Sequence, residues 1–524
     1  MKKNINATVI ILIAATMITS CKKSFDELYQ NPNKPTSVPP ALLMNGTLND
    51  MYDAPYSMYE RWSQYYCCNY DYYGNNRYDF GTGADYYSTL KNVTKMEEEA
   101  QKLGLSAGNP YDAMAKFFKA YFFTKMSLEM GDIPVTEALQ GTSDLVPAYD
   151  PQKLVFQKAF VWLDSANTEL ALLIAGSDNS LQGDIYFDND LSKWQKTVNT
   201  FRLRLLLHLS KKTEDADLNI KQQFASIVNN PTQYHVMEDN SDNMQYNYIF
   251  PTNVYPMNPG NFGFDALRYN TSATYAGLLT QFKDPRVYIT SEPAGALVAA
   301  GKSPTDFDAF VGANPGEDLG TMYVKANSGQ YSLINRKHYY DTYTGEPSIQ
   351  IGYPELCFTI AEAINRGWIS SGPLGSAEDY YKAGIKASWA YYGIPEAGSM
   401  DVFFLHQGAS LGTYDKYTVT VNFDSYYNQP AVKYASGATG LTQILQQRYL
   451  ALFRHSGLES YYTYRRTGVP TFTTGPGTGN SERIAMRFQY PSDEKTANTE
   501  NYNSALKSQY SGNDDINGIM WLLK

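Results

Sequence analysis

The chain has 524 residues and a formal net charge of −10, and 14% of its residues are aromatic, including 45 tyrosines. A chain of this length can bury a large hydrophobic core. Such an acidic balance argues against nucleic-acid binding, because phosphate backbones are recognised by clustered lysines and arginines. Tyrosine has a flat apolar face and a polar hydroxyl, which suit carbohydrate or peptide recognition as well as packing between helices.

The first twenty residues have the order of an export signal. Lys2 and Lys3 precede an apolar segment at residues 7–18, and small residues lead to Cys21. This order is typical of a bacterial lipoprotein signal, in which the cysteine thiol receives the lipid and becomes the new N-terminus. We therefore expect residues 1–20 to be removed and Cys21 to anchor the chain to a membrane. The alternative is an ordinary signal peptide whose cleavage site contains a cysteine.

Residues 21–40 are polar and rich in proline, which predicts an extended tether. A single folded domain is predicted for residues 41–524, and no apolar run after residue 20 reaches the roughly 18 residues that span a bilayer. The other cysteines are Cys67, Cys68 and Cys357. Their spacing does not select a disulfide pair, and we expect most of them to be buried thiols.

Amphipathic helices dominate the first half of the predicted fold. Apolar residues recur at helical spacing from Met114 to Leu128, and Gly131 is expected to end that helix in the left-handed conformation. A second helix is predicted at about residues 151–174. A third is expected to open with a capping box formed by Ser192 and Gln195, and to place Trp194, Val198, Phe201, Leu205 and Leu209 on one face.

The later helices are predicted at about residues 216–229, 355–366, 377–392 and 441–455. The third of these has a capping signal at Ser376 and Asp379, and the last is expected to end at Gly457. Consecutive helical pairs indicate a mainly α fold of tetratricopeptide-like hairpins. Long segments rich in glycine, proline, asparagine and tyrosine separate them, at 240–264, 294–353, 393–436 and 468–524. Such segments are usually functional or contain small sheets, so minor β structure is expected.

Seven segments in the same order along the chain carry a family resemblance. They are NPNKPTSVPPALL (31–43), AYFFTKMSLEMGDIPVTEAL (120–139), WQKTVNTFRLRLLLHLS (194–210), KDPRV (283–287), PELCFTIAEAINRGW (354–368), AEDYYKAGIKASWAYYGI (377–394) and RYLALFRHSGLESYYTYRRTGVP (448–470). Together they resemble the SusD/RagB family, surface lipoproteins that capture nutrients in Bacteroidota. The resemblance implies a helical α/α superhelix that forms a lid over a TonB-dependent, SusC-like outer-membrane transporter.

Two of these motifs have structural interpretations. In the turn Gly131-Asp132-Ile133-Pro134, the glycine ends a helix and the proline prevents its continuation. Glu362 is expected to pair with an arginine such as Arg466, because a half-buried carboxylate needs a partner. Arg465 and Arg466 could form an anion clamp, but a structural role in ion pairs is favoured.

No catalytic motif is apparent. The five histidines are isolated, no His-Glu-x-x-His or Gly-x-Ser-x-Gly sequence occurs, and the glycines at 475–479 lack the Gly-Lys-Ser/Thr ending of a phosphate loop. The sequence therefore predicts a protein that is not an enzyme and has no catalytic residues, metal or cofactor. A glycosidase needs only two carboxylates, so a surface hydrolase of polysaccharide or peptide stays open as an alternative.

The best candidate for a binding site lies between Trp62 and Tyr87, where tyrosines alternate with amides and an arginine. Aromatic faces can stack on sugar rings, while amides and guanidinium groups bind hydroxyl or peptide groups. Trp62, Tyr65 and Tyr66 have helical spacing and are expected in a helix core. The residues around Gly74 are expected to be exposed and to bind the ligand: Tyr72, Tyr73, Asn75, Asn76, Arg77 and Tyr78. A later segment, Tyr246 to Tyr269, is the best partner for this loop.

These observations predict a lipid-anchored outer-membrane protein, facing the cell exterior, that binds an oligomeric nutrient and delivers it to the transporter. A glycan is the favoured ligand and a peptide the alternative. The acids Asp26 and Glu27 come late after Cys21, so a periplasmic orientation stays open. A third interpretation is a helical scaffold lipoprotein that binds only other proteins.

Overall fold

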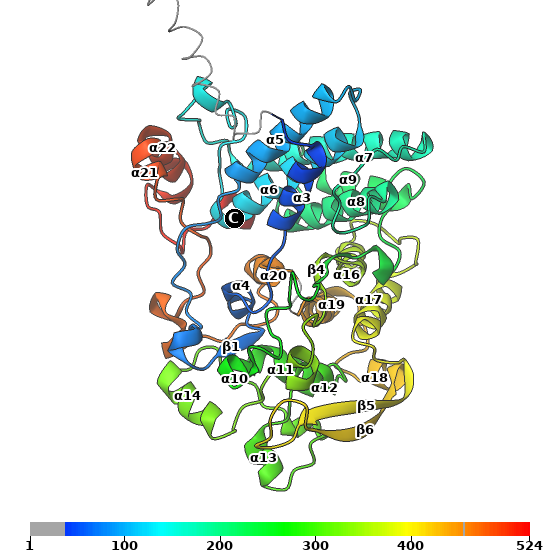
Figure 1. Ribbon diagram of the computed structural model, residues 1–524, viewed down its shortest axis with the longest axis vertical. Helices are drawn as coiled ribbons and strands as arrows, with labels where there is room; N and C mark the ends of the chain where they lie inside the picture. The colour runs from blue at the N-terminus through cyan, green and yellow to red at the C-terminus, as the bar shows by residue number, and fades with distance from the viewer. Residues whose placement is uncertain (1–36, 454–455) are drawn as a thin grey trace, which may run out of the picture.

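A computed structural model describes residues 37–453 and 456–524. The predicted signal, Cys21 and most of the tether lie outside the described residues. Within the described ranges, no helix combines the length and apolar character needed to cross a membrane. The fold is mainly helical, as predicted, with small sheets only (Figure 1).

Antiparallel helices form the upper half of the molecule in Figure 1. They are α3 (Pro40–Asp50), α5 (Tyr87–Lys102), α6 (Pro110–Met130), α7 (Gln152–Ala175), α8 (Leu191–His208) and α9 (Ile220–Asn229). Helix α7 packs against both α6 and α8, so each helical pair buries its apolar face on the next pair. Trp194 of α8 is fully buried, and its ring centroid lies 5.6 Å from that of Phe117 in α6.

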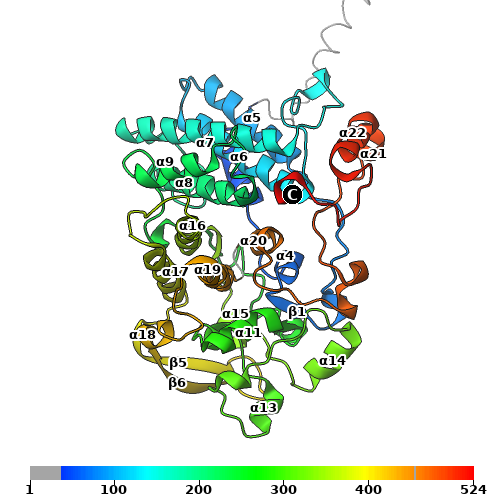
Figure 2. The same cartoon turned by 180° about the vertical axis from the view of Figure 1, so that it is seen from behind.

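A second group of helices continues the stack below α8. It comprises α16 (Tyr353–Asn365), α17 (Ala377–Tyr391), α19 (Gly437–Ala451) and α20 (Glu459–Thr467). Helix α16 packs against α8, α17 and α19, which places it at the centre of the molecule. Figure 2, viewed from behind, shows the same order of helices from top to bottom.

Most of the short elements lie in the lower part, and the described residues form three two-stranded antiparallel sheets at and below the level of α16. The strands are β1 (Tyr66–Cys68) with β3 (Tyr269–Thr271), β2 (Met244–Tyr246) with β4 (Ser348–Ile351), and β5 (Ala397–Leu405) with β6 (Tyr414–Asn422). The short helices are α4 (Met58–Trp62), α10 (Phe262–Asp265), α11 (Ala273–Phe282), α12 (Val287–Thr290), α13 (Gly295–Ala299), α14 (Leu319–Asn327), α15 (Arg336–Tyr340) and α18 (Phe423–Tyr427). Helices α21 (Glu494–Ala497) and α22 (Thr499–Tyr510) lie at the upper flank. The long segments therefore do contain small sheets, as expected.

Several helix boundaries differ from the sequence prediction. The capping box at Ser376 and Asp379 is confirmed at the start of α17. The prediction of a capping box at Ser192 is wrong. The side chain of Asp190 instead accepts hydrogen bonds from the backbone N–H groups at the start of α8. Helix α9 begins at Ile220, four residues later than expected, and α19 ends at Ala451. Helices α20 and α22, which follow the last predicted helix, were not predicted.

Gly131 ends α6, but not in the left-handed helical conformation that the sequence suggested. Its φ is +102° and its ψ is −125°. A Cβ atom at this position would lie 2.3 Å from both Gln509 Oε1 and the Tyr510 hydroxyl oxygen. Glycine is therefore required both by the positive φ and by the close approach of α22.

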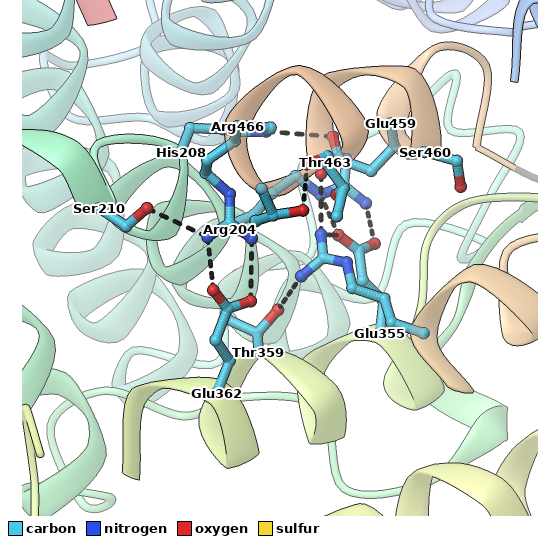
Figure 3. Close-up of polar contacts among 12 residues, drawn as sticks. Arg204, His208, Ser210, Glu355, Thr359, Glu362, Glu459, Ser460, Thr463 and Arg466 are labelled. Carbon is cyan, nitrogen blue, oxygen red and sulfur yellow. Dashed lines mark hydrogen bonds and ion pairs between the residues drawn. The ribbon is translucent and has the colours of Figure 1, made fainter. Parts of the chain in front are cut away.

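Buried ion pairs connect the two groups of helices (Figure 3). Arg204 of α8 and Arg448 of α19 both donate to Glu355 of α16. Arg448 also donates to Glu459 of α20, at 2.8 Å, and His208 of α8 contacts the same carboxylate at 3.1 Å. Burial by itself would raise the pKa of Glu459, but His208, Arg204 and Arg448 around it hold the pKa below its usual value. The network therefore stays ionised and joins four helices.

The predicted pairing of Glu362 with Arg466 is confirmed. Both side chains are buried, and Arg466 donates to both carboxylate oxygens of Glu362. Arg465 donates instead to the backbone carbonyls of Leu128 and Met486. The two arginines thus have structural roles. Cys67, Cys68 and Cys357 are buried free thiols, as expected.

Candidate ligand-binding site

The segment from Trp62 to Tyr66 fixes the base of the candidate loop in the core. Trp62, Tyr65 and Tyr66 are all buried, as predicted. Their burial does not come from one continuous helix, because α4 ends at Trp62 and Tyr66 opens β1. Pairing of β1 with β3 places Cys68 opposite Tyr269. This brings the end of the predicted partner segment next to the loop.

The predicted exposure of Asn76 and Tyr78 is wrong. The Asn76 amide accepts a hydrogen bond from the backbone N–H of Cys68 and donates to its carbonyl, both at 2.9 Å. The Tyr78 hydroxyl donates to the carbonyl of Trp62 at 2.7 Å. Both side chains are buried inside the loop, where a ligand cannot reach them. They are needed there because buried backbone groups of Cys68 and Trp62 must have hydrogen-bond partners.

Gly74 makes a sharp turn in the loop just before Asn76 and Tyr78. Its φ is +135°, and a Cβ atom would lie 2.0 Å from Nη1 of Arg61. The Arg61 side chain thus occupies the space beside the glycine backbone, and its Nη1 lies 3.5 Å from the Tyr73 carbonyl oxygen. A side chain at position 74 would displace this support.

The outer face of the loop carries an aromatic cluster, defined here as Tyr70, Tyr72, Tyr73, Tyr323 and Arg268. Tyr72 is 84% exposed, Tyr70 42% and Tyr323 39%. The rings of Tyr72 and Tyr73 meet edge to face with centroids 5.1 Å apart, and those of Tyr70 and Tyr323 lie 5.5 Å apart. The Arg268 guanidinium lies over the Tyr70 ring at 4.9 Å. Exposed rings held by such contacts form a preorganised stacking surface.

Asn75 and Arg77 flank this cluster. Arg77 is exposed and pairs with Asp79 at 2.5 Å, and the Asn75 side chain accepts a hydrogen bond from the backbone N–H of Arg77. A solvent-exposed pair of this kind contributes little to stability. The Arg77 guanidinium can therefore exchange its partner for a ligand group at small cost.

Three members of the cluster were not predicted as site residues from the sequence. Arg268 reaches the loop through the β1–β3 pairing, and Tyr323 comes from α14, some 250 residues after the loop. Among these three, only Tyr70 could have been predicted from the sequence, because it stands among neighbouring tyrosines. In the predicted partner segment, Tyr248, Tyr255 and Tyr269 are buried and Phe264 is 70% exposed. The three tyrosines therefore belong to the core, whereas much of the rest of the segment is exposed.

Comparison with known proteins decides the family. The family model described as "Starch-binding associating with outer membrane" matches residues 32–491. The chain belongs to the SusD-like family. A SusD homologue from Bacteroides fragilis is 32% identical, with a TM-score of 0.79 over 93% of this chain and 100% of that chain. An outer-membrane protein from Bacteroides vulgatus, described as involved in nutrient binding, is 30% identical, with a TM-score of 0.76 and the same coverage.

A more distant SusD-like structure shares the fold. A chitin-binding SusD homologue from Flavobacterium johnsoniae is 20% identical, with a TM-score of 0.68 over 93% of this chain and 98% of that chain. No curated protein matches this chain. The description of the family links this SusD-like fold to starch binding and to the outer membrane.

Proposed function

We propose that this SusD-like protein is an outer-membrane lipoprotein, anchored through Cys21, that binds an oligomeric glycan at the aromatic cluster and delivers it to a TonB-dependent, SusC-like transporter. The proposal rests on the exposed rings of Tyr70 and Tyr72, with the half-buried Tyr73 beside them, on a fold of this family. Aromatic faces bind the C–H face of pyranose rings, and Arg77 and Asn75 supply hydrogen-bonding groups for the hydroxyls.

Binding of this kind needs no covalent chemistry. Glu355, Glu362 and Glu459 are each paired with arginine in the core, so these carboxylates hold helices together. None of them lies in the aromatic cluster. The proposed action is therefore capture by stacking and hydrogen bonds, followed by release to the transporter, and the chain itself acts as a binding protein.

The first test is a screen of the purified chain, without the signal and the anchor cysteine, against malto-oligosaccharides, chito-oligosaccharides and short peptides by calorimetry. We expect saturable binding to one glycan class and no hydrolysis product on prolonged incubation. Binding confined to peptides, or turnover of a glycan, would contradict the proposal.

The transporter and the anchor need a second test in cells. Full-length protein extracted in mild detergent should co-purify with a TonB-dependent barrel, and Cys21→Ala should release the protein from the membrane fraction. Retention of the Cys21→Ala variant in the membrane would reject the lipid anchor, and the absence of a barrel would reject the delivery step.

A further inference from the structure

A separate cavity lies beside the aromatic cluster, in the lower part of the molecule. Its volume is about 310 Å³, and it is lined by residues of α13 and α14 and of the β5–β6 hairpin, among others. The residues that line it include Glu292, Asn327, Tyr331, Arg336, Gln407 and Tyr417. This volume is at the lower end of the range for small-molecule sites, which suits one or two sugar rings.

The walls of the cavity combine aromatic faces with polar groups. Tyr417 of β6 is half-buried, and its ring centroid lies 5.9 Å from that of the buried Phe404. Tyr331 is fixed by its hydroxyl, which donates to Glu317 at 2.6 Å. Asn327 and Gln407 are exposed amides at the rim. Ring faces with convergent amides are the same chemistry that the aromatic cluster offers to a glycan.

Arg336 and Glu292 form an ion pair in the lining of the cavity. Arg336 donates through Nε and Nη2 to Glu292, whose carboxylate also accepts from the Arg336 backbone N–H at 2.8 Å. None of these hydrogen bonds uses Nη1 of Arg336. The pair holds the guanidinium in place while leaving a donor that a hydroxyl or carbonyl oxygen can accept from.

The cavity adjoins the aromatic cluster along two chain segments. Leu267, which lines the cavity, is followed directly by Arg268, whose guanidinium lies over the Tyr70 ring. On α14, Tyr323 contacts Tyr70, and Asn327, four residues later, lines the cavity. Four residues of helix advance about 6 Å, close to the length of one sugar unit. One extended oligosaccharide can therefore contact both the aromatic cluster and the cavity.

We propose that this cavity is a second glycan subsite, which receives the next one or two sugar units of a chain that stacks on the aromatic cluster. This proposal rests on the proposed function, because it takes the ligand to be an oligosaccharide. It adds that recognition depends on chain length: a short oligosaccharide occupies the cluster alone, and a longer one also fills the cavity. Joining the two contacts in one ligand strengthens binding through a high effective concentration at the second subsite.

The test measures affinity for a short and a long oligosaccharide of the glycan class found in the screen. The cavity variants are Tyr417→Ala, at a half-buried position, and Asn327→Ala, at an exposed one, and the melting temperature of each is measured to confirm that it folds. We expect each to weaken binding of the long chain at least fivefold and to leave the short chain unchanged. Tyr72→Ala should weaken both.

Thr420→Ala serves as the matched control, because Thr420 lies on the same strand as Tyr417 with an exposed side chain outside the cavity. Wild-type affinity of both cavity variants for both chain lengths, together with a loss in Tyr72→Ala, would overturn the second subsite and leave the proposed function standing. If the wild type binds no oligosaccharide of either length, both proposals fall.

Discussion

Glu362 in α16 accepts hydrogen bonds through both carboxylate oxygens from Arg466 in α20, 104 residues later in the chain. Arg366 contacts the same carboxylate, and Ser210, which follows α8, receives a further hydrogen bond from Arg466 at 3.0 Å. The Glu362–Arg466 pair thus joins three parts of the scaffold, because Glu362 lies in α16, Arg466 in α20, and Arg466 also reaches Ser210 after α8.

Removing this carboxylate charge should destabilise the fold. Glu362→Gln leaves the buried Arg466 guanidinium without its counterion, which costs about 3 kcal/mol of unfolding free energy. Urea unfolding followed by circular dichroism measures the change. Glu214→Gln is the matched control, because Glu214 forms an exposed pair with Lys221, and it should behave as wild type. Equal stability of the two variants would show that the buried pair is not important.

The same pair predicts a dependence of stability on acid. Burial acts to raise the pKa of Glu362, but Arg466 and Arg366 lower it from 4.5 to about 2. A lowered pKa means that the stabilisation is complete above pH 4.5 and is lost as pH falls towards 2. At roughly 1.4 kcal/mol per pKa unit, the loss is about 3 kcal/mol. The stability difference between wild type and Glu362→Gln should therefore shrink over this window. A constant difference from pH 6 to pH 2 would contradict the assignment.

Glu129 of α6 should show the opposite dependence. Its Oε2 accepts from the backbone N–H of Ala84 at 2.7 Å, while its Oε1 is buried with no hydrogen-bond partner in the described part of the chain. Burial raises its pKa from 4.5 to about 7. A raised pKa means that stability is full below pH 4.5 and decreases as pH rises through 7.

Glu129→Gln removes this ionisation while keeping the shape and the acceptor oxygen. Thermal melts should therefore show the variant close to wild type at pH 4 and more stable at pH 8. A variant that is less stable than wild type at pH 8 would indicate that the ionised carboxylate has a favourable partner.

Mutation of the buried loop residue Asn76 should lower the stability of the fold, whereas mutation of the exposed Tyr72 should not. Asn76→Ala leaves both backbone groups of Cys68 without partners, which costs about 2 kcal/mol. Tyr72→Ala removes an 84% exposed ring and should leave stability unchanged. Unfolding curves for the two variants test this separation. Equal stability losses would show that Tyr72 also supports the loop.

Local patterns predicted much of the scaffold. The apolar spacing of α6, α7 and α8 and the cap at Ser376 depend on residues close in sequence, and Glu362 needed a cation because its neighbours are apolar. Helix α20 was missed because its sequence, ESYYTYRRT, is polar and aromatic without a clear apolar stripe. Its burial comes from contacts with other helices, which local periodicity does not encode.

The site was predicted only in part, for the same reason. Tyr72 and Tyr73 were found because tyrosines gather around Gly74. Whether Asn76 and Tyr78 face solvent depends on how the chain returns to Cys68 and Trp62, and the sequence contains no local signal for this. Tyr323 joins the cluster through the tertiary fold alone.

The central claim is that the exposed rings of the aromatic cluster bind a glycan. The most direct measurement is calorimetric titration of the wild type and of Tyr72→Ala/Tyr73→Ala with the oligosaccharide selected by the screen. The control is Tyr343→Ala, which removes a 37% exposed tyrosine outside the cluster. We expect at least a tenfold loss of affinity in the double variant and wild-type affinity in the control. Unchanged affinity in the double variant would show that these rings do not bind the glycan.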